Sequence, residues 1–147
     1  MSGIVLLVED NADDVMFVHL AFQQAKLDHK LMIVSDGGQA LDYLRGEGPY
    51  ADRSKFPIPS VVLLDLRMPG VDGFEVLKQV RHEPRLKNLP ITVFTGSNDP
   101  EHFARARELG ANSVVLKPFK IDRFFEAVRT IADFWLNYCK LPQAQPA

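Results

Sequence analysis

The stretch VVLLDLRMPGVDGFEVL, residues 61–77, decides the fold of this chain. It opens with the continuous apolar run Val61–Leu64, continues with Asp65 and a Pro-Gly turn, and ends in the helical spacing of Phe74 and Leu77. A continuous run of Val and Leu is typical of a strand that is buried on both faces of a sheet. The stretch therefore predicts a strand, a turn and a helix, with an acidic residue at the carboxyl end of the strand.

The same unit recurs along the chain. Short apolar runs occur at Ile4–Val8, Leu31–Val34, Val61–Leu64, Ile91–Phe94 and Ser113–Leu116. Segments with the apolar spacing of amphipathic helices lie between these runs. Strands that alternate with helices form parallel sheets with helices on both faces. We therefore predict an α/β fold of three αβα layers, with a five-stranded parallel sheet in the strand order 2-1-3-4-5.

Two segments depart from a minimal version of this pattern. Gly46–Pro59 (GEGPYADRSKFPIP) is rich in Gly and Pro and predicts a long loop before the third strand. The apolar stripe from Ile121 to Tyr138 is longer than a helix beside one short strand needs, and Leu141-Pro142 ends it. We predict a single domain over residues 1–147, with a core at about 4–132 and a C-terminal helical extension at about 133–147.

Composition and charge limit the class of protein. The chain has 147 residues, of which 46% are hydrophobic and 24% charged, and these values are typical of one globular domain. The formal net charge of -2 argues against DNA as the main partner. The single cysteine, Cys139, excludes an intrachain disulfide and a cysteine metal site. No apolar run is long enough for a signal peptide or a membrane span, so we expect a cytoplasmic protein without a membrane partner.

Polar residues follow four of the predicted strands, namely Glu9 and Asp10, Asp65, Thr95 and Lys117. Sites in open parallel sheets form at the carboxyl ends of the strands, where the strand order reverses. Carboxylates that converge there repel one another, and oxygen ligands without His or Cys suit Mg²⁺. A metal ion and Lys117 can neutralise charge on a transferring phosphoryl group, to which Thr95 can donate a hydrogen bond. Asp65 is the predicted carboxylate nucleophile.

Four motifs follow one another along the chain: Val8-Glu9-Asp10, the run Asp65–Leu77, Thr95-Gly96 and Lys117-Pro118-Phe119. Together they resemble the receiver domain of bacterial two-component response regulators, and the resemblance covers residues 4–132. It implies a flavodoxin-like receiver fold and a signalling protein rather than an enzyme. In such a protein Asp65 accepts a phosphoryl group from the phosphohistidine of a sensor histidine kinase.

The resemblance also implies a role for each site residue. Glu9, Asp10, Asp65 and the backbone carbonyl of Arg67 would hold Mg²⁺ or Mn²⁺. Lys117 would pair with the phosphoryl oxygens, while Thr95 and the Gly96 amide would contact the same group. The peptide bond between Lys117 and Pro118 would be cis, as it is in the family.

Two residues depart from the pattern of the family. Val114 stands where members often carry an aromatic residue that moves together with the threonine. We therefore expect the signal to leave through the loop Thr95–Pro100 or through a changed interface. Arg67 stands where a shorter polar residue is common, and we expect it to contact the phosphoryl group or to screen it from water.

Other polar residues are expected to have structural roles. Asp13 and Asp14 are interpreted as first-turn charges that the helix dipole favours. The histidines show no metal-ligand spacing and are expected at the surface or half-buried; they are His19, His29, His82 and His102. Cys139 is expected to pack on the last helix.

The signal is expected to leave the protein by binding. Only residues 133–147 follow the receiver, so we expect a stand-alone receiver with no DNA-binding module. Candidate surfaces are the last helix and the apolar residues Met16, Phe17 and Leu20 of the first helix. The tail and the insertion Gly46–Pro59 resemble those of single-domain regulators that are paired with phytochrome-type sensor kinases. That resemblance implies such a kinase as the phosphodonor and a homodimer built partly from the C-terminal helix.

Three other functions are compatible with parts of this sequence. A phosphatase with an aspartyl-phosphate intermediate needs a second Asp two residues after the nucleophile, where this chain has Arg67. A flavodoxin-like scaffold for a small cofactor needs a phosphate loop after the first strand, where the chain has the anionic sequence Glu9-Asp10-Asn11. A receiver-like interaction module that is never phosphorylated would not need the site residues, all of which are present.

Overall fold

The computed structural model describes residues 3–25 and 29–138. The strands are β1 (Ile4–Val8), β2 (Lys30–Val34), β3 (Val61–Leu64), β4 (Ile91–Thr95) and β5 (Ser113–Leu116). The helices are α1 (Ala12–Gln24), α2 (Gly37–Arg45), α3 (Gly73–His82), α4 (Pro100–Glu108) and α5 (Ile121–Asp133). A 3-10 turn, η1 (Gly48–Tyr50), follows α2, and a π-helical turn, η2 (Phe134–Tyr138), continues α5.

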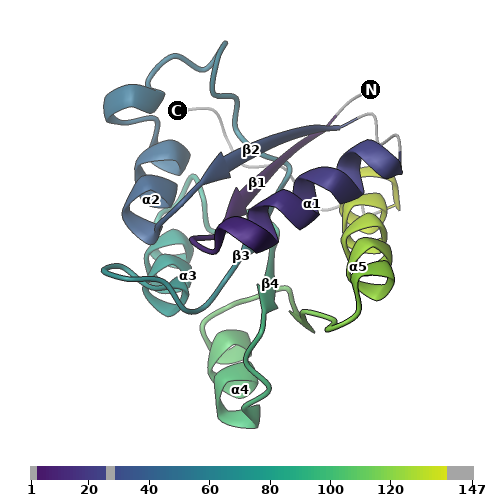
Figure 1. Cartoon of the computed structure of the whole chain (residues 1–147). Helices are drawn as coiled ribbons and strands as arrows, with labels where there is room; N and C mark the ends of the chain where they lie inside the picture. The colour runs from purple at the N-terminus through teal and green to yellow at the C-terminus, as the bar shows by residue number, and fades with distance from the viewer. Residues whose placement is uncertain (1–2, 26–28, 139–147) are drawn as a thin grey trace.

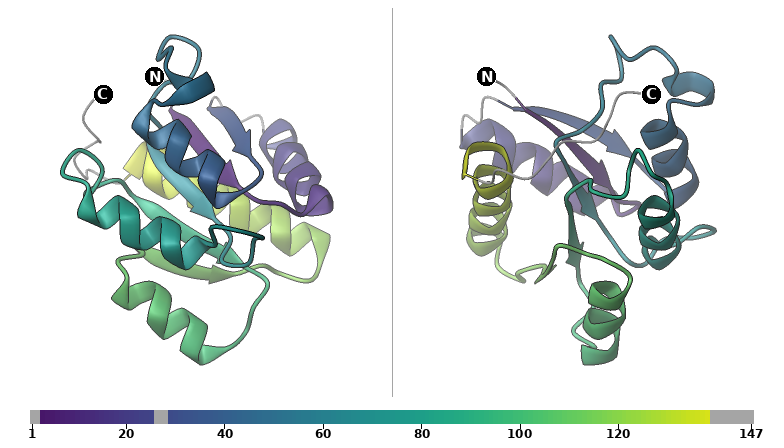
Figure 2. Two further views of the ribbon diagram at one scale, coloured as in Figure 1. Left: turned by 90° about the vertical axis from the view of Figure 1, so that its left-hand side faces the viewer. Right: turned by 180° about the vertical axis from the view of Figure 1, so that it is seen from behind.

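The strands form one parallel sheet in the order β2-β1-β3-β4-β5, which confirms the predicted fold. Helices α1 and α5 cover one face of the sheet, and α2, α3 and α4 cover the other (Figures 1 and 2). Val8 is in register with Val34 on one side and with Leu64 on the other. The central strands therefore end together, and the residues that follow them share one edge of the sheet.

The core has two layers, one on each face of the sheet. Leu6 and Val8 of β1 pack in the layer under α2 and α3, whereas Val5 and Leu7 pack in the layer under α1 and α5. Successive side chains of a strand point to opposite faces, so a strand between two helical layers must be apolar at every position. This explains why the strands appear in the sequence as continuous apolar runs.

The insertion Gly46–Pro59 is an ordered loop that folds back on the end of α2. The Arg53 guanidinium donates hydrogen bonds to the carbonyl oxygens of Tyr43, Leu44 and Phe56, at 2.7, 2.8 and 3.1 Å. The rings of Tyr43, Tyr50 and Phe56 pack against one another, with centroids 5.1 to 6.0 Å apart. The predicted loop therefore has an arginine at its centre that caps the last carbonyls of the helix before it.

The C-terminal segment packs on the sheet beyond α5. Trp135 is buried, and its indole N–H donates a hydrogen bond of 2.8 Å to Oγ1 of Thr92 in β4. Phe134, the preceding residue, is half exposed. The predicted extension thus begins inside the core, while Cys139 and Leu141-Pro142 lie outside the described residues. None of the helices in residues 3–25 and 29–138 has the length and apolarity to cross a membrane.

Candidate functional site: an acidic cluster at the strand ends

The ends of β1 and β3 bring three carboxylates together. The Glu9 amide donates to the Val34 carbonyl and the Asp65 amide donates to the Val8 carbonyl, each at 3.1 Å, so both residues continue the sheet pairing by one step. One oxygen from each of Glu9, Asp10 and Asp65 lies within 4.8 Å of the others. The structure therefore brings together the three side chains that the sequence analysis assigned to the metal site.

A glycine lets the helix that follows β3 approach Asp65. The Gly73 amide donates a 3.1 Å hydrogen bond to the Leu66 carbonyl, and Asp72 caps α3 through the amide of Glu75. A Cβ atom at position 73 would stand 2.3 Å from the Asp65 carbonyl oxygen, which is closer than nonbonded atoms can be. The Asp-Gly pair before α3 thus has a physical reason, since only glycine fits beside the backbone of the candidate phosphoacceptor.

The carboxylates differ in burial. Glu9 is 2% exposed and Asp65 is 8% exposed, while Asp10 is exposed to solvent. Burial raises the pKa of Glu9 to about 7, and the hydrogen bond from Lys117 offsets only part of that effect. A group of oxygen donors with no His or Cys suits a hard dication such as Mg²⁺ or Mn²⁺, so these residues fit the metal that the sequence predicts.

Lys117 reaches the cluster from the end of β5. Its backbone amide donates to the Thr95 carbonyl at 2.7 Å, which ties β5 to β4 beside the site. Its ammonium group donates to Glu9 Oε2 at 2.6 Å and to Asp14 Oδ2 at 2.8 Å, and it lies 3.5 Å from Asp65 Oδ2. Burial of Lys117 acts to lower its pKa, but the hydrogen bonds to Asp14 and Glu9, together with the charges of Asp65 and Glu9, outweigh burial and raise the pKa.

Asp14 is more than the helix charge that the sequence analysis expected. It lies in the first turn of α1, where the dipole does favour an acid, but its carboxylate pairs with Lys117. No spacing in the sequence signals this role, because Asp10 lies before α1 and the rotation of α1 about its axis decides which way Asp14 faces. Asp13, one residue earlier, is exposed, as expected.

Thr95 stands at the end of β4 with its side chain fully buried. Its Oγ1 accepts a 3.1 Å hydrogen bond from the Ser97 amide, and the hydroxyl of Ser97 lies 2.7 Å from Nδ1 of His102. The ring of His102 packs edge-on against Phe74 of α3, with centroids 5.8 Å apart. His102 is half-buried, as predicted, but sequence spacing alone did not reveal its link to the end of β4.

A shallow opening of about 480 Å³ leads to the cluster; it is lined by Asp10, Leu66, Arg67, Met68, Pro69, Asp72, Phe74 and His102. The side chain of Arg67 is exposed at this opening. Gly96, the residue after Thr95, is also exposed, so its backbone is open to an incoming group. The site is therefore closed by the sheet on its inner side and open to a large donor on its outer side.

One prediction from the family resemblance is wrong. The peptide bond between Lys117 and Pro118 is not cis, because residues 3–25 and 29–138 contain no cis peptide bond. The trans form is the more stable one for an X-Pro bond, by about 0.5–1 kcal/mol, and Lys117 reaches its partners in that form.

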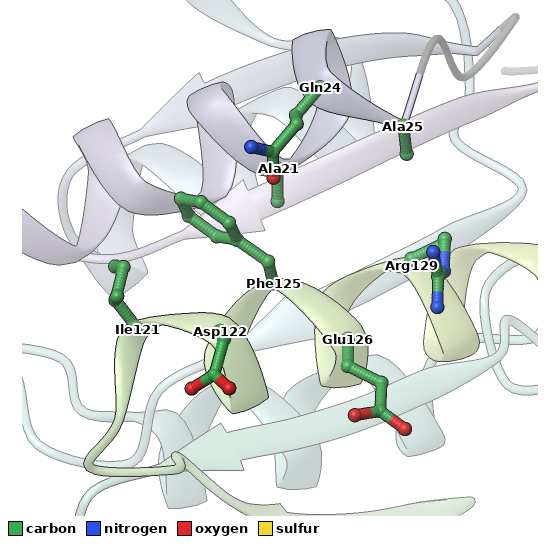
Figure 3. Close-up of a pocket in the computed structure, with 8 residues that line it drawn as sticks. All are labelled: Ala21, Gln24, Ala25, Ile121, Asp122, Phe125, Glu126 and Arg129. Carbon is green, nitrogen blue, oxygen red and sulfur yellow. The ribbon is translucent and has the colours of Figure 1, made fainter.

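A second hollow, of about 550 Å³, lies between α1 and α5. Figure 3 shows Phe125 reaching from α5 toward Ala21 of α1, with Arg129 one turn further along α5. None of Glu9, Asp10, Asp65 and Lys117 lines it. The acidic cluster and this helical groove are therefore separate features of the surface.

Comparisons with known proteins agree on one family. Residues 5–129 match the family model of the response regulator receiver domain. The chain is 35% identical over 141 residues to the response regulator Rcp1 of Synechocystis, covering 96% of this chain and 94% of Rcp1. It is 39% identical over 140 residues to a probable methanogenesis regulatory protein, FilR2, of Methanothrix harundinacea, covering 95% of this chain and 87% of FilR2.

Two solved structures have the same fold at similar identity. The phosphorylated cyanobacterial phytochrome response regulator RcpA superposes with a TM-score of 0.90 at 33% identity, over 97% of this chain and 100% of RcpA. The Mn²⁺-bound form of Rcp1 superposes with a TM-score of 0.85 at 34% identity, over 95% of this chain and 99% of that one.

Proposed function

The chain belongs to the family of response regulator receiver domains, and on this premise we propose that it accepts a phosphoryl group on Asp65 from a sensor histidine kinase in a Mg²⁺-dependent reaction. The observation that carries the proposal is the position of Asp65. One of its oxygens lies within 4.8 Å of an oxygen of Glu9 and of Asp10, and its Oδ2 lies 3.5 Å from the Lys117 ammonium. Phosphoryl transfer needs a nucleophile and positive charge close to the phosphoryl oxygens. Asp65 can supply the first, while Lys117 and a metal ion held by the carboxylates can supply the second.

In the proposed reaction an oxygen of Asp65 attacks the phosphorus of a phosphohistidine. A phosphorus–oxygen bond forms, the phosphorus–nitrogen bond breaks, and its electron pair leaves with the imidazole. Mg²⁺ or Mn²⁺, held by Glu9, Asp10, Asp65 and the Arg67 carbonyl, would neutralise charge on the phosphoryl oxygens. The chain supplies the Lys117 ammonium to the same oxygens.

Thr95 and the Gly96 amide would donate hydrogen bonds to the transferred group. Thr95 Oγ1 now accepts from the Ser97 amide, so its hydroxyl has to turn toward Asp65 to play this part. Arg67, exposed at the opening, would contact the phosphoryl group or screen it from water. With Arg67 in the place of an acid, the site lacks the second Asp of an aspartyl-phosphate phosphatase, so we propose a phosphoacceptor protein and not an enzyme.

A phytochrome-type sensor kinase is the proposed phosphodonor. The support is the similarity to RcpA, described as a phytochrome response regulator, and to the response regulator RPA3017 in red light signalling of R. palustris, at 35% identity and a TM-score of 0.90. The apolar side chains of Met16 and Leu20 on α1 are 50% and 39% exposed, and we propose that they contact the donor. Phe17 contributes less than expected, because it is half-buried against Phe124.

We propose that the phosphorylated state is read through the start of α4. Ser97 links Thr95 to His102, and Asp99 caps α4 through the amide of Glu101. Of the residues of α4 only Ala106 is buried, so this helix is the least firmly held part of its layer. A turn of the Thr95 hydroxyl toward Asp65 would release the Ser97 amide and let the helix start shift, without an aromatic residue at position 114.

We further propose that residues 1–147 form a single receiver domain in the cytoplasm. Two copies of this domain would form a homodimer through the C-terminal helix. Phe134, half exposed beside the buried Trp135, offers an apolar contact for a second copy. The net charge of -2 supports a protein partner rather than DNA.

Incubation with acetyl phosphate and Mg²⁺, followed by intact-mass analysis, tests the proposal. We expect a phosphoryl adduct in the wild-type protein and none in Asp65→Asn, which keeps the shape of the side chain but lacks the nucleophile. The adduct should also fail to form when Mg²⁺ is removed with a chelator. A wild-type protein that stays unmodified, or a variant that is modified equally, would rule the proposal out.

A further inference from the structure

We propose that Asp14 is a positioning residue that anchors the ammonium group of Lys117 beside Asp65 while the other carboxylates hold the metal ion. The inference rests on the proposed function, because it concerns the same phosphoryl transfer. Its starting point is the pair of short contacts that Lys117 makes, 2.6 Å to Glu9 Oε2 and 2.8 Å to Asp14 Oδ2.

The partners of Lys117 fall into two classes. Glu9 and Asp65 belong to the group of carboxylates whose oxygens converge within 4.8 Å, and Asp14 does not belong to it. A dication in that group would take up the negative charge of Glu9 and Asp65 and would repel the ammonium of Lys117. Of the carboxylates that lie near the Lys117 ammonium among the described residues, Asp14 is then the one whose negative charge still attracts it.

Asp14 is well placed to act as an anchor. Its backbone amide donates a 3.0 Å hydrogen bond to Oδ1 of Asn11, the N-cap of α1, so its position in the first turn is fixed. The side chains of Lys117 and Asp14 are 10% and 24% exposed, so solvent screens their attraction only in part. The other end of Lys117 is fixed as well, by the hydrogen bond from its amide to Thr95.

The anchor has a consequence for catalysis. Lys117 Nζ already lies 3.5 Å from Asp65 Oδ2, next to where phosphoryl oxygens would form. A cation that is held there before the reaction stabilises the developing charge without having to be reorganised. Without Asp14, Lys117 would lose the carboxylate partner that the metal ion does not occupy. Its long and flexible side chain would then sample other rotamers.

The rate of phosphorylation at saturating Mg²⁺ tests the inference. With acetyl phosphate as donor, we expect Asp14→Asn to lower the maximal rate about tenfold, which is the effect of losing one charge-assisted hydrogen bond in the transition state. Asp13→Asn is the matched control: it removes the same charge from the same helical turn, at an exposed position. It should react at close to the wild-type rate, and Asp14→Glu should recover part of the loss.

Two further measurements distinguish anchoring from a general effect on structure. In a Lys117→Met background the rate is already low, and Asp14→Asn should lower it no further than Asp13→Asn does. In the metal-free protein, an NMR titration of the Lys117 ε-carbon should show a lower lysine pKa in Asp14→Asn and an unchanged one in Asp13→Asn, because the Asp14 hydrogen bond helps to raise that pKa.

The outcomes separate the inference from the proposed function. The anchoring role would be overturned if Asp14→Asn were phosphorylated at the wild-type rate. It would also be overturned if Asp14→Asn lowered the rate by the same factor in the Lys117→Met background as in the wild-type background. Either result would leave Asp65 as the phosphoacceptor. A wild-type protein that forms no adduct would overturn the proposed function, and the anchoring role with it.

Discussion

At the scale of single residues, Glu9 is the least exposed carboxylate of the proposed metal site. Its carboxyl is 2% exposed, faces Asp65 and touches Lys117. Burial raises its pKa from 4.5 to about 7. Burial thus favours the protonated form of Glu9, and a metal ion that binds this carboxylate would displace the proton.

This shift predicts that metal binding depends on pH. Between pH 4.5 and about 7 Glu9 binds more protons in the folded metal-free protein than in the unfolded chain, so the contribution of Glu9 to stability decreases as the pH rises through that range. For the same reason the apparent affinity for Mg²⁺ should weaken as the pH falls from about 8 to about 6, with release of a proton on binding. Calorimetric titrations in buffers of different ionisation enthalpy measure both effects. Glu9→Gln is the control, in which the dependence should be much reduced, and a pH-independent wild type would contradict the account.

At the scale of elements, the insertion Gly46–Pro59 depends on one half-buried arginine, Arg53. The Arg53 guanidinium donates hydrogen bonds to three carbonyl oxygens, which order the loop. Its Nε is buried without a hydrogen-bond partner among the described residues, which offsets part of this stabilisation. The sequence predicted a loop here from its Gly and Pro residues. It could not predict an ordered loop, because the contacts of Arg53 with Tyr43 and Leu44 join residues that no local pattern relates.

Arg53→Ala should therefore destabilise the protein by about 2 kcal/mol, since three partly buried carbonyls lose a charged donor. Arg45→Ala is a suitable comparison, because Arg45 pairs with Glu83 at a site where both side chains are 30% exposed. That substitution should cost less than about 1 kcal/mol. Urea unfolding of both variants gives the two values, and a loss in Arg53→Ala no larger than in Arg45→Ala would disprove the role of the loop arginine.

The link between β4 and α4 is the second feature at this scale. If Ser97 carries the change from Thr95 to His102, then Ser97→Ala should loosen α4 before phosphorylation and reduce the further change on phosphorylation. Hydrogen exchange of Pro100–Glu108, with and without acetyl phosphate and Mg²⁺, measures this. Thr130→Ala, which removes a hydroxyl from α5, is the control. A variant whose α4 responds as strongly as that of the wild type would exclude this route.

At the scale of the whole molecule, the fold and the convergence of Glu9, Asp10 and Asp65 could be predicted for one physical reason. Strands between two helical layers are almost entirely apolar, so a charged residue such as Asp65 or Lys117 marks a strand end, and the carboxyl ends share one edge. The roles of Asp14 and His102 were not predictable in this way. Each depends on the rotation of a helix about its axis, which the packing of α1 and α4 on the sheet decides.

The C-terminal segment connects the fold to assembly. Removing everything after Ile131 would also remove Trp135, which is buried and bonded to Thr92, so such a truncation would test stability as well as association. A substitution at the exposed neighbour is cleaner. Phe134→Glu should shift the proposed dimer toward monomer in sedimentation velocity, while Asn137→Glu, which adds the same charge at another exposed position of η2, should not. A Phe134→Glu protein that remains dimeric would show that the interface lies elsewhere.

The central claim is that Asp65 is the residue that takes the phosphoryl group, in a reaction that needs the metal. Borohydride reduction converts an aspartyl phosphate to homoserine, which peptide mass mapping can locate in the chain. After treatment with acetyl phosphate and Mg²⁺, the account predicts homoserine at position 65 and unmodified Glu9, Asp10 and Asp14, with no conversion in the presence of a chelator. Conversion at another carboxylate, or equal conversion of Asp65 without the metal, would contradict it.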